Sequence, residues 1–99
     1  MNDELTLIVP IHAKTECRER VRGLLLDLAA RTRQEAGNSC YALHEVRDDP
    51  DQFIIYERWR GQSALDFHMG QTYLVDFLAR EEELLSKPIR GMYCRLLAG

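Results

Sequence analysis

Apolar and polar residues alternate at the start of the chain, with leucine, valine, isoleucine and alanine at the odd-numbered positions from 5 to 13. A period of two is typical of a β-strand, so the pattern predicts a strand over residues 5–13. Pro10 removes one donor from the hydrogen-bond ladder, and we therefore expect this strand to lie at a sheet edge or to be bulged at Pro10.

The period then changes to that of a helix. Thr15 is suited to cap the start of this helix, and Gly37 is suited to end it. Between them, apolar positions recur at intervals of three and four, which predicts an amphipathic helix of about five turns with one buried stripe. The stripe consists of Val21, Leu24, Leu25, Leu28, Ala29 and Thr32.

Two more alternating segments, residues 39–47 and 52–60, flank the acidic sequence at positions 48–51, whose composition is that of a turn. They predict a β-hairpin. Large apolar side chains occur on both of its faces, so we expect both sides of the sheet to be covered.

The rest of the chain predicts more helix and a last strand. Ser63 is a suitable cap for a short helix that contains residues 64–68, and Gly70 interrupts it. A second helix is expected from about residue 72 until Lys87-Pro88 ends it. Residues 89–97 are expected to form the final strand.

These elements run β-α-β-β-α-β through a single domain, residues 1–99, which predicts an α+β fold of the ferredoxin-like type. Its four-stranded antiparallel sheet would carry the helices on one face. The other face would hold apolar and aromatic side chains, too many to leave in water in a chain this small. We therefore predict a homodimer in which the sheet faces of two subunits pack together.

Composition narrows the classes of partner and location. The net charge is −3, which argues against a nucleic-acid partner. The acidic start and the short apolar runs indicate neither a signal peptide nor a membrane span, so we expect a cytoplasmic protein. The three cysteines form no CxxC pair, which favours reduced thiols, and no spacing of histidines and cysteines supports a metal site.

His68 is the strongest candidate for chemistry, because its helix must fold back over the sheet near the end of the strand that contains Trp59. Imidazole titrates near neutral pH, so His68 could serve as an acid, a base or a ligand anchor. It could equally be a structural histidine bonded to a carbonyl. Trp59 could stack on an aromatic ligand or could close the end of the core.

Four other residues are candidates for the same site. Glu57 points to the helix-covered face, where a buried carboxylate needs a partner, and Arg90 or His68 could provide one. This pairing could belong to a site or be a structural salt bridge. Tyr73, five residues after His68, could hydrogen-bond a ligand hydroxyl or lie on the surface. Phe67 completes the candidate substrate-binding set.

The chain resembles the antibiotic biosynthesis monooxygenase domain family in four segments: residues 5–9 (LTLIV), 32–43 (TRQEAGNSCYAL), 53–59 (FIIYERW) and 64–68 (ALDFH). The resemblance implies a dimeric ferredoxin-like α+β barrel with a pocket between sheet and helices. Characterised members include cofactor-independent monooxygenases that oxidise quinols and polycyclic phenols with dioxygen. Others cleave haem or isomerise small signalling molecules, so the fold alone does not set the reaction.

By this resemblance, Trp59 and His68 match aromatic and histidine positions that line the pocket in relatives. Many quinol-type relatives have a second histidine five residues after the first, and Tyr73 stands in that place here. The first-strand asparagine of the haem-cleaving relatives is not apparent, which disfavours haem degradation.

The leading hypothesis is a monooxygenase that needs no cofactor and uses dioxygen to oxidise an electron-rich aromatic substrate. His68 would be the base or the hydrogen-bond partner of the substrate anion, Tyr73 a contact to the substrate hydroxyl, and Trp59 a stacking wall. One alternative is a domain that binds or isomerises a small polar metabolite, which a pocket with Glu57 and Arg90 facing inward would favour. The other is a dimeric domain without catalysis, which a collapsed gap between helices and sheet would favour.

Overall fold

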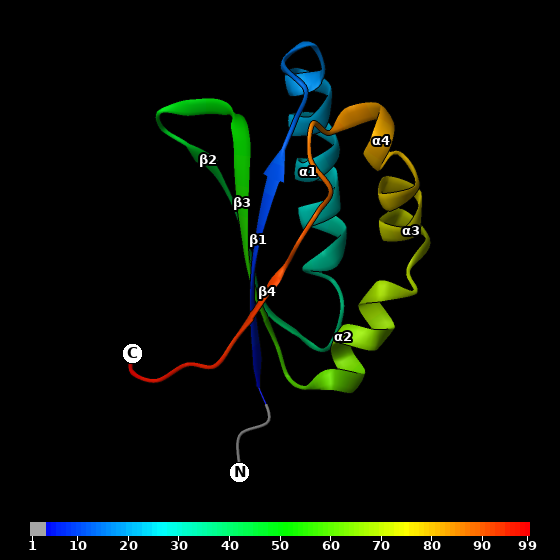
Figure 1. Ribbon diagram of the computed structural model, residues 1–99. Helices are drawn as coiled ribbons and strands as arrows, with labels where there is room; N and C mark the ends of the chain where they lie inside the picture. The colour runs from blue at the N-terminus through cyan, green and yellow to red at the C-terminus, as the bar shows by residue number, and fades with distance from the viewer. Residues whose placement is uncertain (1–3) are drawn as a thin grey trace.

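A computed structural model describes residues 4–99, and residues 1–3, on which part of the expectation about a signal peptide rests, lie outside this range. The helices and strands follow one another along the chain as drawn in Figure 1. They are β1 (Leu5–His12), a 3-10 turn (Thr15–Cys17), α1 (Arg18–Thr32), β2 (Asn38–Val46), β3 (Asp49–Trp59), α2 (Gln62–Met69), α3 (Thr72–Ala79), α4 (Glu81–Leu84) and β4 (Met92–Cys94).

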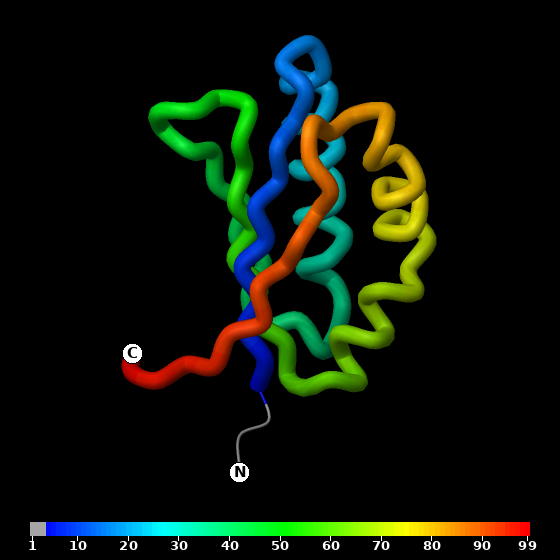
Figure 2. The backbone as a smooth tube through the Cα atoms, viewed as in Figure 1, coloured from blue at the N-terminus to red at the C-terminus, as the bar shows by residue number. Residues whose placement is uncertain are grey.

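The four strands form one antiparallel sheet in the order β2-β3-β1-β4. All of the helices lie on the same side of this sheet (Figure 1), and the smooth trace in Figure 2 shows the same two layers. This arrangement confirms the α+β, ferredoxin-like topology. The core lies between the layers, because the inward residues of β1 and β3 and the apolar stripe of α1 are buried there.

Strand β1 lies between β3 and β4 and has no bulge at Pro10, but its second edge is open at that residue. Its whole length pairs with β3 in an unbroken register, with Pro10 opposite Ile54. On its other side, β4 pairs only with residues 6–8 of β1. No strand among residues 4–99 flanks Pro10 on that side, so its missing N–H interrupts no ladder there.

Helix α1 ends at Thr32, earlier than the predicted end at Gly37. The next residues form tight turns, in which the amide of Glu35 bonds the carbonyl of Thr32 and that of Asn38 bonds the carbonyl of Glu35. Gly37 is instead a point of close approach, since a Cβ there would lie 2.3 Å from the Cβ of Ala64 on α2. The chain leaves the helix to make this contact.

The C-terminal third differs most from expectation. The second predicted helix is divided into α3 and α4 at Arg80. The predicted last strand shrinks to Met92–Cys94, which pairs only with residues 6–8 of β1. The hairpin turn is also shorter than predicted, since β3 already begins at Asp49 and only residues 47–48 form the turn.

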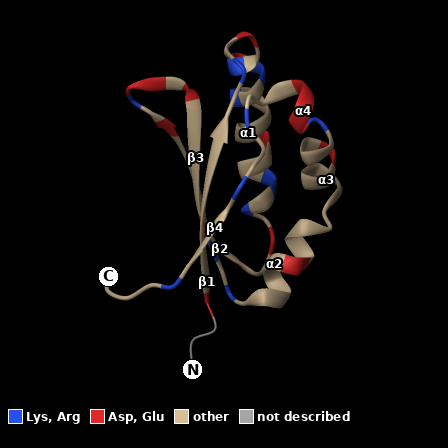
Figure 3. Cartoon of the chain, viewed as in Figure 1, with Lys and Arg blue, Asp and Glu red and all other residues tan. Residues whose placement is uncertain are grey.

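Charged residues lie mainly on the outer surface of α1, on α4 and at the tip of the β2–β3 hairpin, which is rich in acids (Figure 3). No helix within residues 4–99 is long and apolar enough to cross a membrane. Within the same residues, no group of three or more histidine, cysteine or acidic side chains is placed to hold a metal ion.

Candidate functional site

A cavity of about 380 Å³ lies between the sheet and the helices. Aliphatic and aromatic side chains from β1, β3 and α3 form most of its wall, among them Val9, Ile55 and Phe77. Three buried ionisable residues border it: Tyr41, Glu57 and His68. The cavity is therefore apolar along most of its surface, with polar chemistry confined to a few side chains.

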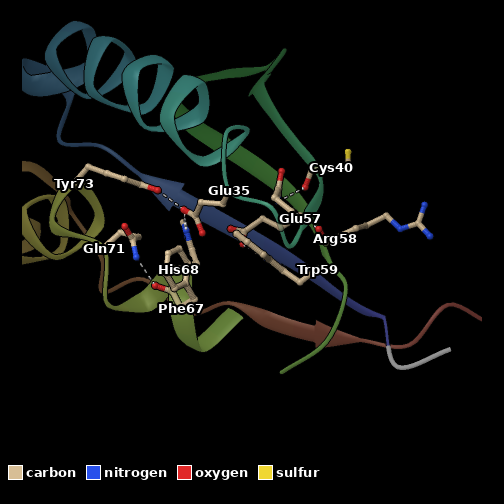
Figure 4. A network of polar contacts seen from close by, with 10 residues as sticks. Glu35, Cys40, Glu57, Arg58, Trp59, Phe67, His68, Gln71 and Tyr73 are labelled. Carbon is tan, nitrogen blue, oxygen red and sulfur yellow. Dashed lines mark hydrogen bonds and ion pairs between the residues drawn. The ribbon is translucent and has the colours of Figure 1, made fainter. Parts of the chain in front are cut away.

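Helix α2 places His68 in this wall, where the residue is only 2% exposed. One face of its ring packs on Trp59, with centroids 4.5 Å apart and planes tilted by 35°. The ring of Tyr41 meets it edge-on at 6.0 Å. On the side toward α1, Nδ1 of His68 lies 2.8 Å from Oε2 of Glu35 (Figure 4).

Glu35 comes from the turn after α1 and is 9% exposed. The same Oε2 atom that contacts His68 also accepts a hydrogen bond from the hydroxyl of Tyr73 on α3. The other oxygen, Oε1, is buried and has no hydrogen-bond partner within residues 4–99. Three separate segments of the chain thus meet at one carboxylate oxygen, as Figure 4 shows.

Nothing in the sequence pattern singles out Glu35. It lies in a charged run that continues the helical periodicity of α1, so it reads as part of a solvated face. The one local signal is that two small residues, Ala36 and Gly37, follow it and let the turn pack closely against α2. The pairing with His68 spans 33 positions and depends on the tertiary fold.

Glu57 is 5% exposed, as expected for its strand face. Its partner is neither Arg90 nor His68 but the indole of Trp59, whose Nε1 donates to Oε1 of Glu57 at 2.9 Å. Burial raises the pKa of the Glu57 carboxyl, and the Trp59 hydrogen bond and the nearby His68 only partly oppose this. The neutral form of Glu57 is therefore favoured more than it would be in water.

Tyr73 and Trp59 do not border the cavity in the way the sequence suggests. The hydroxyl of Tyr73 is directed to Glu35. Trp59 is fully buried behind His68 and is absent from the cavity wall. Tyr73 bonds Glu35, which contacts the imidazole, and Trp59 packs on the imidazole itself. Both residues therefore support His68 and do not form the cavity wall.

Arg90 and Phe67 lie away from the cavity. Phe67 is 61% exposed, on the side of α2 turned away from the sheet. Arg90 is exposed in a surface hollow beside Pro10 and His12, which point to the opposite face of the sheet. The inward orientation expected for Arg90 relied on a regular strand from residue 89, but the chain is irregular until Met92, so the alternation does not apply.

The chain is similar to several known proteins. A "Putative monooxygenase YcnE" of Bacillus subtilis is 33% identical over 79 residues, which cover 80% of this chain and 83% of that protein. A "Putative monooxygenase Rv0793" of Mycobacterium tuberculosis is 30% identical over 90% of this chain and 87% of its own length. Its solved structure superimposes with a TM-score of 0.90 over 97% of both chains.

The crystal structure of PA3566 from Pseudomonas aeruginosa has a TM-score of 0.92 at 34% identity, covering 99% of this chain and 98% of its own. The sequence model of the family described as "Antibiotic biosynthesis monooxygenase" matches residues 5–80. That match includes both layers of the fold and all of the residues that contact His68. The chain belongs to the antibiotic biosynthesis monooxygenase family.

Proposed function

We propose that this protein is a cofactor-independent monooxygenase that oxidises an electron-rich phenol or quinol with dioxygen inside the cavity. The observation that carries the proposal is a buried imidazole bordering an apolar cavity. Its Nδ1 is engaged by Glu35, whereas Nε2 has no hydrogen-bond partner within residues 4–99. Nε2 is thus the ring nitrogen that a ligand in the cavity would meet. The monooxygenase names of relatives at about 30% identity support the same reaction class.

The chemistry begins with transfer of the phenolic proton to Nε2 of His68, which acts as general base. The phenolate, far more easily oxidised than the phenol, passes one electron to dioxygen. The resulting radicals combine at a ring carbon that bears hydrogen, and the peroxide takes the proton back from His68. The peroxide then loses water, which takes with it the hydrogen of that ring carbon, and a quinone remains. One phenol and one dioxygen thus give one quinone and one water.

The protein's contribution is an environment in which the anion forms and water is excluded. An apolar wall favours a flat aromatic substrate and also the uncharged dioxygen molecule. Burial raises the pKa of the Glu57 carboxyl and so increases the share of its neutral form, and in that form Glu57 donates a hydrogen bond to a substrate oxyanion and does not repel it.

The alternative of a polar-metabolite binding or isomerising domain depended on Glu57 and Arg90 facing the pocket together. Glu57 borders the cavity, but Arg90 does not. The cavity itself is open and has not collapsed, contrary to the feature expected of a domain without catalysis. The geometry therefore favours the oxidative reaction.

The homodimer is part of this proposal. The sheet face opposite the helices carries Ile8, Ile54 and Tyr56, which are only half-buried in one subunit. A second copy packed on this face would remove them from water. Size-exclusion chromatography with light scattering tests this: a species of twice 11.5 kDa is expected, and a monomer of 11.5 kDa would contradict it.

The test of the reaction is oxygen consumption with a panel of quinols and polycyclic phenols. Wild-type protein should consume one dioxygen per quinone formed. His68→Ala should lose about 100- to 10,000-fold in rate, the usual contribution of general base catalysis. Asp66→Asn is the matched control, because Asp66 is exposed on the same helix and does not border the cavity. No oxygen uptake with any member of the panel would refute the proposal, and equal rates for wild type and His68→Ala would remove His68 from the mechanism.

A further inference from the structure

We propose that Glu35 and Tyr73 form a clamp that fixes both the orientation and the tautomer of His68. The effect of this clamp on catalysis rests on the proposed function, whereas its effect on the tautomer of His68 does not. Glu35 and Tyr73 would be positioning residues, since their contacts are with His68 and with each other and neither borders the cavity. Tyr73 then has a different role from the substrate contact expected from the sequence.

Stacking alone leaves the imidazole undetermined. Trp59 packs against the face of the ring and so sets its plane. A 180° rotation of the ring about its Cβ–Cγ bond keeps that stacking but puts a carbon in the place of Nδ1. Only the hydrogen bond to Glu35 distinguishes the two orientations, because a C–H group is a poor replacement for a donor facing a buried carboxylate.

The carboxylate also dictates where the ring proton lies. An ionised carboxylate can only accept hydrogen bonds, so the neutral imidazole must carry its hydrogen on Nδ1. Nε2 then keeps its lone pair, which is what a base requires. If Glu35 were instead to donate a proton, Nδ1 would be the acceptor and Nε2 would carry the hydrogen, unable to take a proton from a substrate.

Tyr73 supports the accepting form of Glu35. Its hydroxyl donates to the same Oε2 atom, so this oxygen already acts as an acceptor toward a second partner. Burial, together with this hydrogen bond, raises the pKa of the Tyr73 hydroxyl, so Tyr73 retains its proton and remains a donor at neutral pH. The clamp thus joins the turn after α1, helix α2 and helix α3 at a single atom.

The direct test is the two-bond ¹H–¹⁵N correlation spectrum of protein labelled with ¹⁵N-histidine, at a pH where the imidazoles are neutral. The chain has three histidines, and His12→Gln and His44→Gln assign the other two signals. The clamp requires His68 with a protonated Nδ1 and an unprotonated Nε2. The opposite tautomer in the wild-type protein would overturn the proposal. This measurement needs no substrate, so it decides the matter even if no quinol is oxidised.

Variants separate the two members of the clamp. Glu35→Gln keeps the shape, but its amide can donate as well as accept, so the tautomer should become mixed. With the best quinol of the panel, kcat should fall about 10- to 100-fold while KM stays within about two-fold. Glu82→Gln, an exposed acid on α4, is the matched control. An unchanged tautomer and an unchanged kcat in Glu35→Gln would contradict the role of Glu35.

Tyr73→Phe should keep the Nδ1-protonated tautomer, because Glu35 still accepts from His68, and it should lower kcat less than Glu35→Gln does. A rise in KM with the tautomer intact would show that Tyr73 contacts the substrate directly, which would overturn its assignment to the clamp. If the tautomer is as expected and no substrate is oxidised, the clamp stands and the proposed reaction fails.

Discussion

The close approach of Gly37 to helix α2 makes a sharp prediction for Gly37→Ala. A Cβ at position 37 would lie 2.3 Å from the Cβ of Ala64 and 3.3 Å from its Cα. Carbon atoms in contact prefer roughly 3.5–4.0 Å, so more than about 1 Å of separation must be created. Ala64 has no rotamer that could move aside, and the backbone itself must shift.

Overpacking of this kind costs about 1–3 kcal/mol, and we expect a value near about 2 kcal/mol because the obstacle is rigid. For a domain of this size, that lowers Tm by roughly 8–16 °C. Ala64→Gly alone should cost about 0.5–1 kcal/mol, the usual penalty of glycine in a helix. In the double variant the 2.3 Å clash with the Cβ is absent and only the 3.3 Å contact with the Cα remains, so the two changes should be coupled by at most about −2 kcal/mol.

Urea unfolding followed by tryptophan fluorescence measures this cycle, since Trp59 is the only tryptophan and lies against His68. Gly37 lies two residues from Glu35, and Ala64 lies one helical turn before His68. The same displacement should therefore pull Glu35 away from His68 and lower turnover, with recovery in the double variant. Additive free energies, with coupling near zero, would refute the steric reasoning.

Three further outcomes follow from the site. Since the folded protein raises the pKa of Glu57, it keeps a proton that the unfolded chain loses above about pH 4.3, and the stability contributed by this group falls as pH rises from there toward the raised pKa. Urea unfolding should therefore show wild type losing stability relative to Glu57→Gln as pH rises above about 4.3, and parallel profiles would speak against it. Arg90→Ala should leave kcat and KM within about two-fold of wild type in the oxygen assay, because Arg90 lies outside the cavity; loss of turnover would mean that its placement is wrong. Leu78→Phe narrows the cavity and should raise KM by about 10-fold or more with a smaller effect on kcat, which steady-state kinetics with a bulky and a small quinol can check.

Much of the layer that faces the helices was predictable from local periodicity. The alternation in β1 and β3 assigns Glu57 and Trp59 to the covered face, and both are buried there. The stripe of α1 is buried at every predicted position except Leu24, which is partly buried. The buried face of a strand or helix follows from its period alone, so predicting it requires no information about residues distant in the sequence.

The parts that escaped prediction depend on distant partners. Residues 33–36 are compatible with helix, but the chain turns there because Gly37 must reach Ala64 on α2. That turn is what brings Glu35 to His68. Likewise, β4 pairs only with residues 6–8 of β1, and the exposed position of Arg90 goes with the irregular chain that precedes this strand.

The origin of the cavity wall has a consequence for how proteins of this kind can diverge. The imidazole of His68 and the two side chains of the contact network beside it, Glu35 and Tyr73, all precede position 74. A separate stretch, residues 74–91, supplies Leu74, Phe77, Leu78 and Ile89 to the same wall. Substitutions in this later stretch would therefore change the shape of the cavity while His68 and its contacts stay in place. A crossover between homologues just after Tyr73 would exchange this part of the wall and keep the part that β1, β3 and α2 supply.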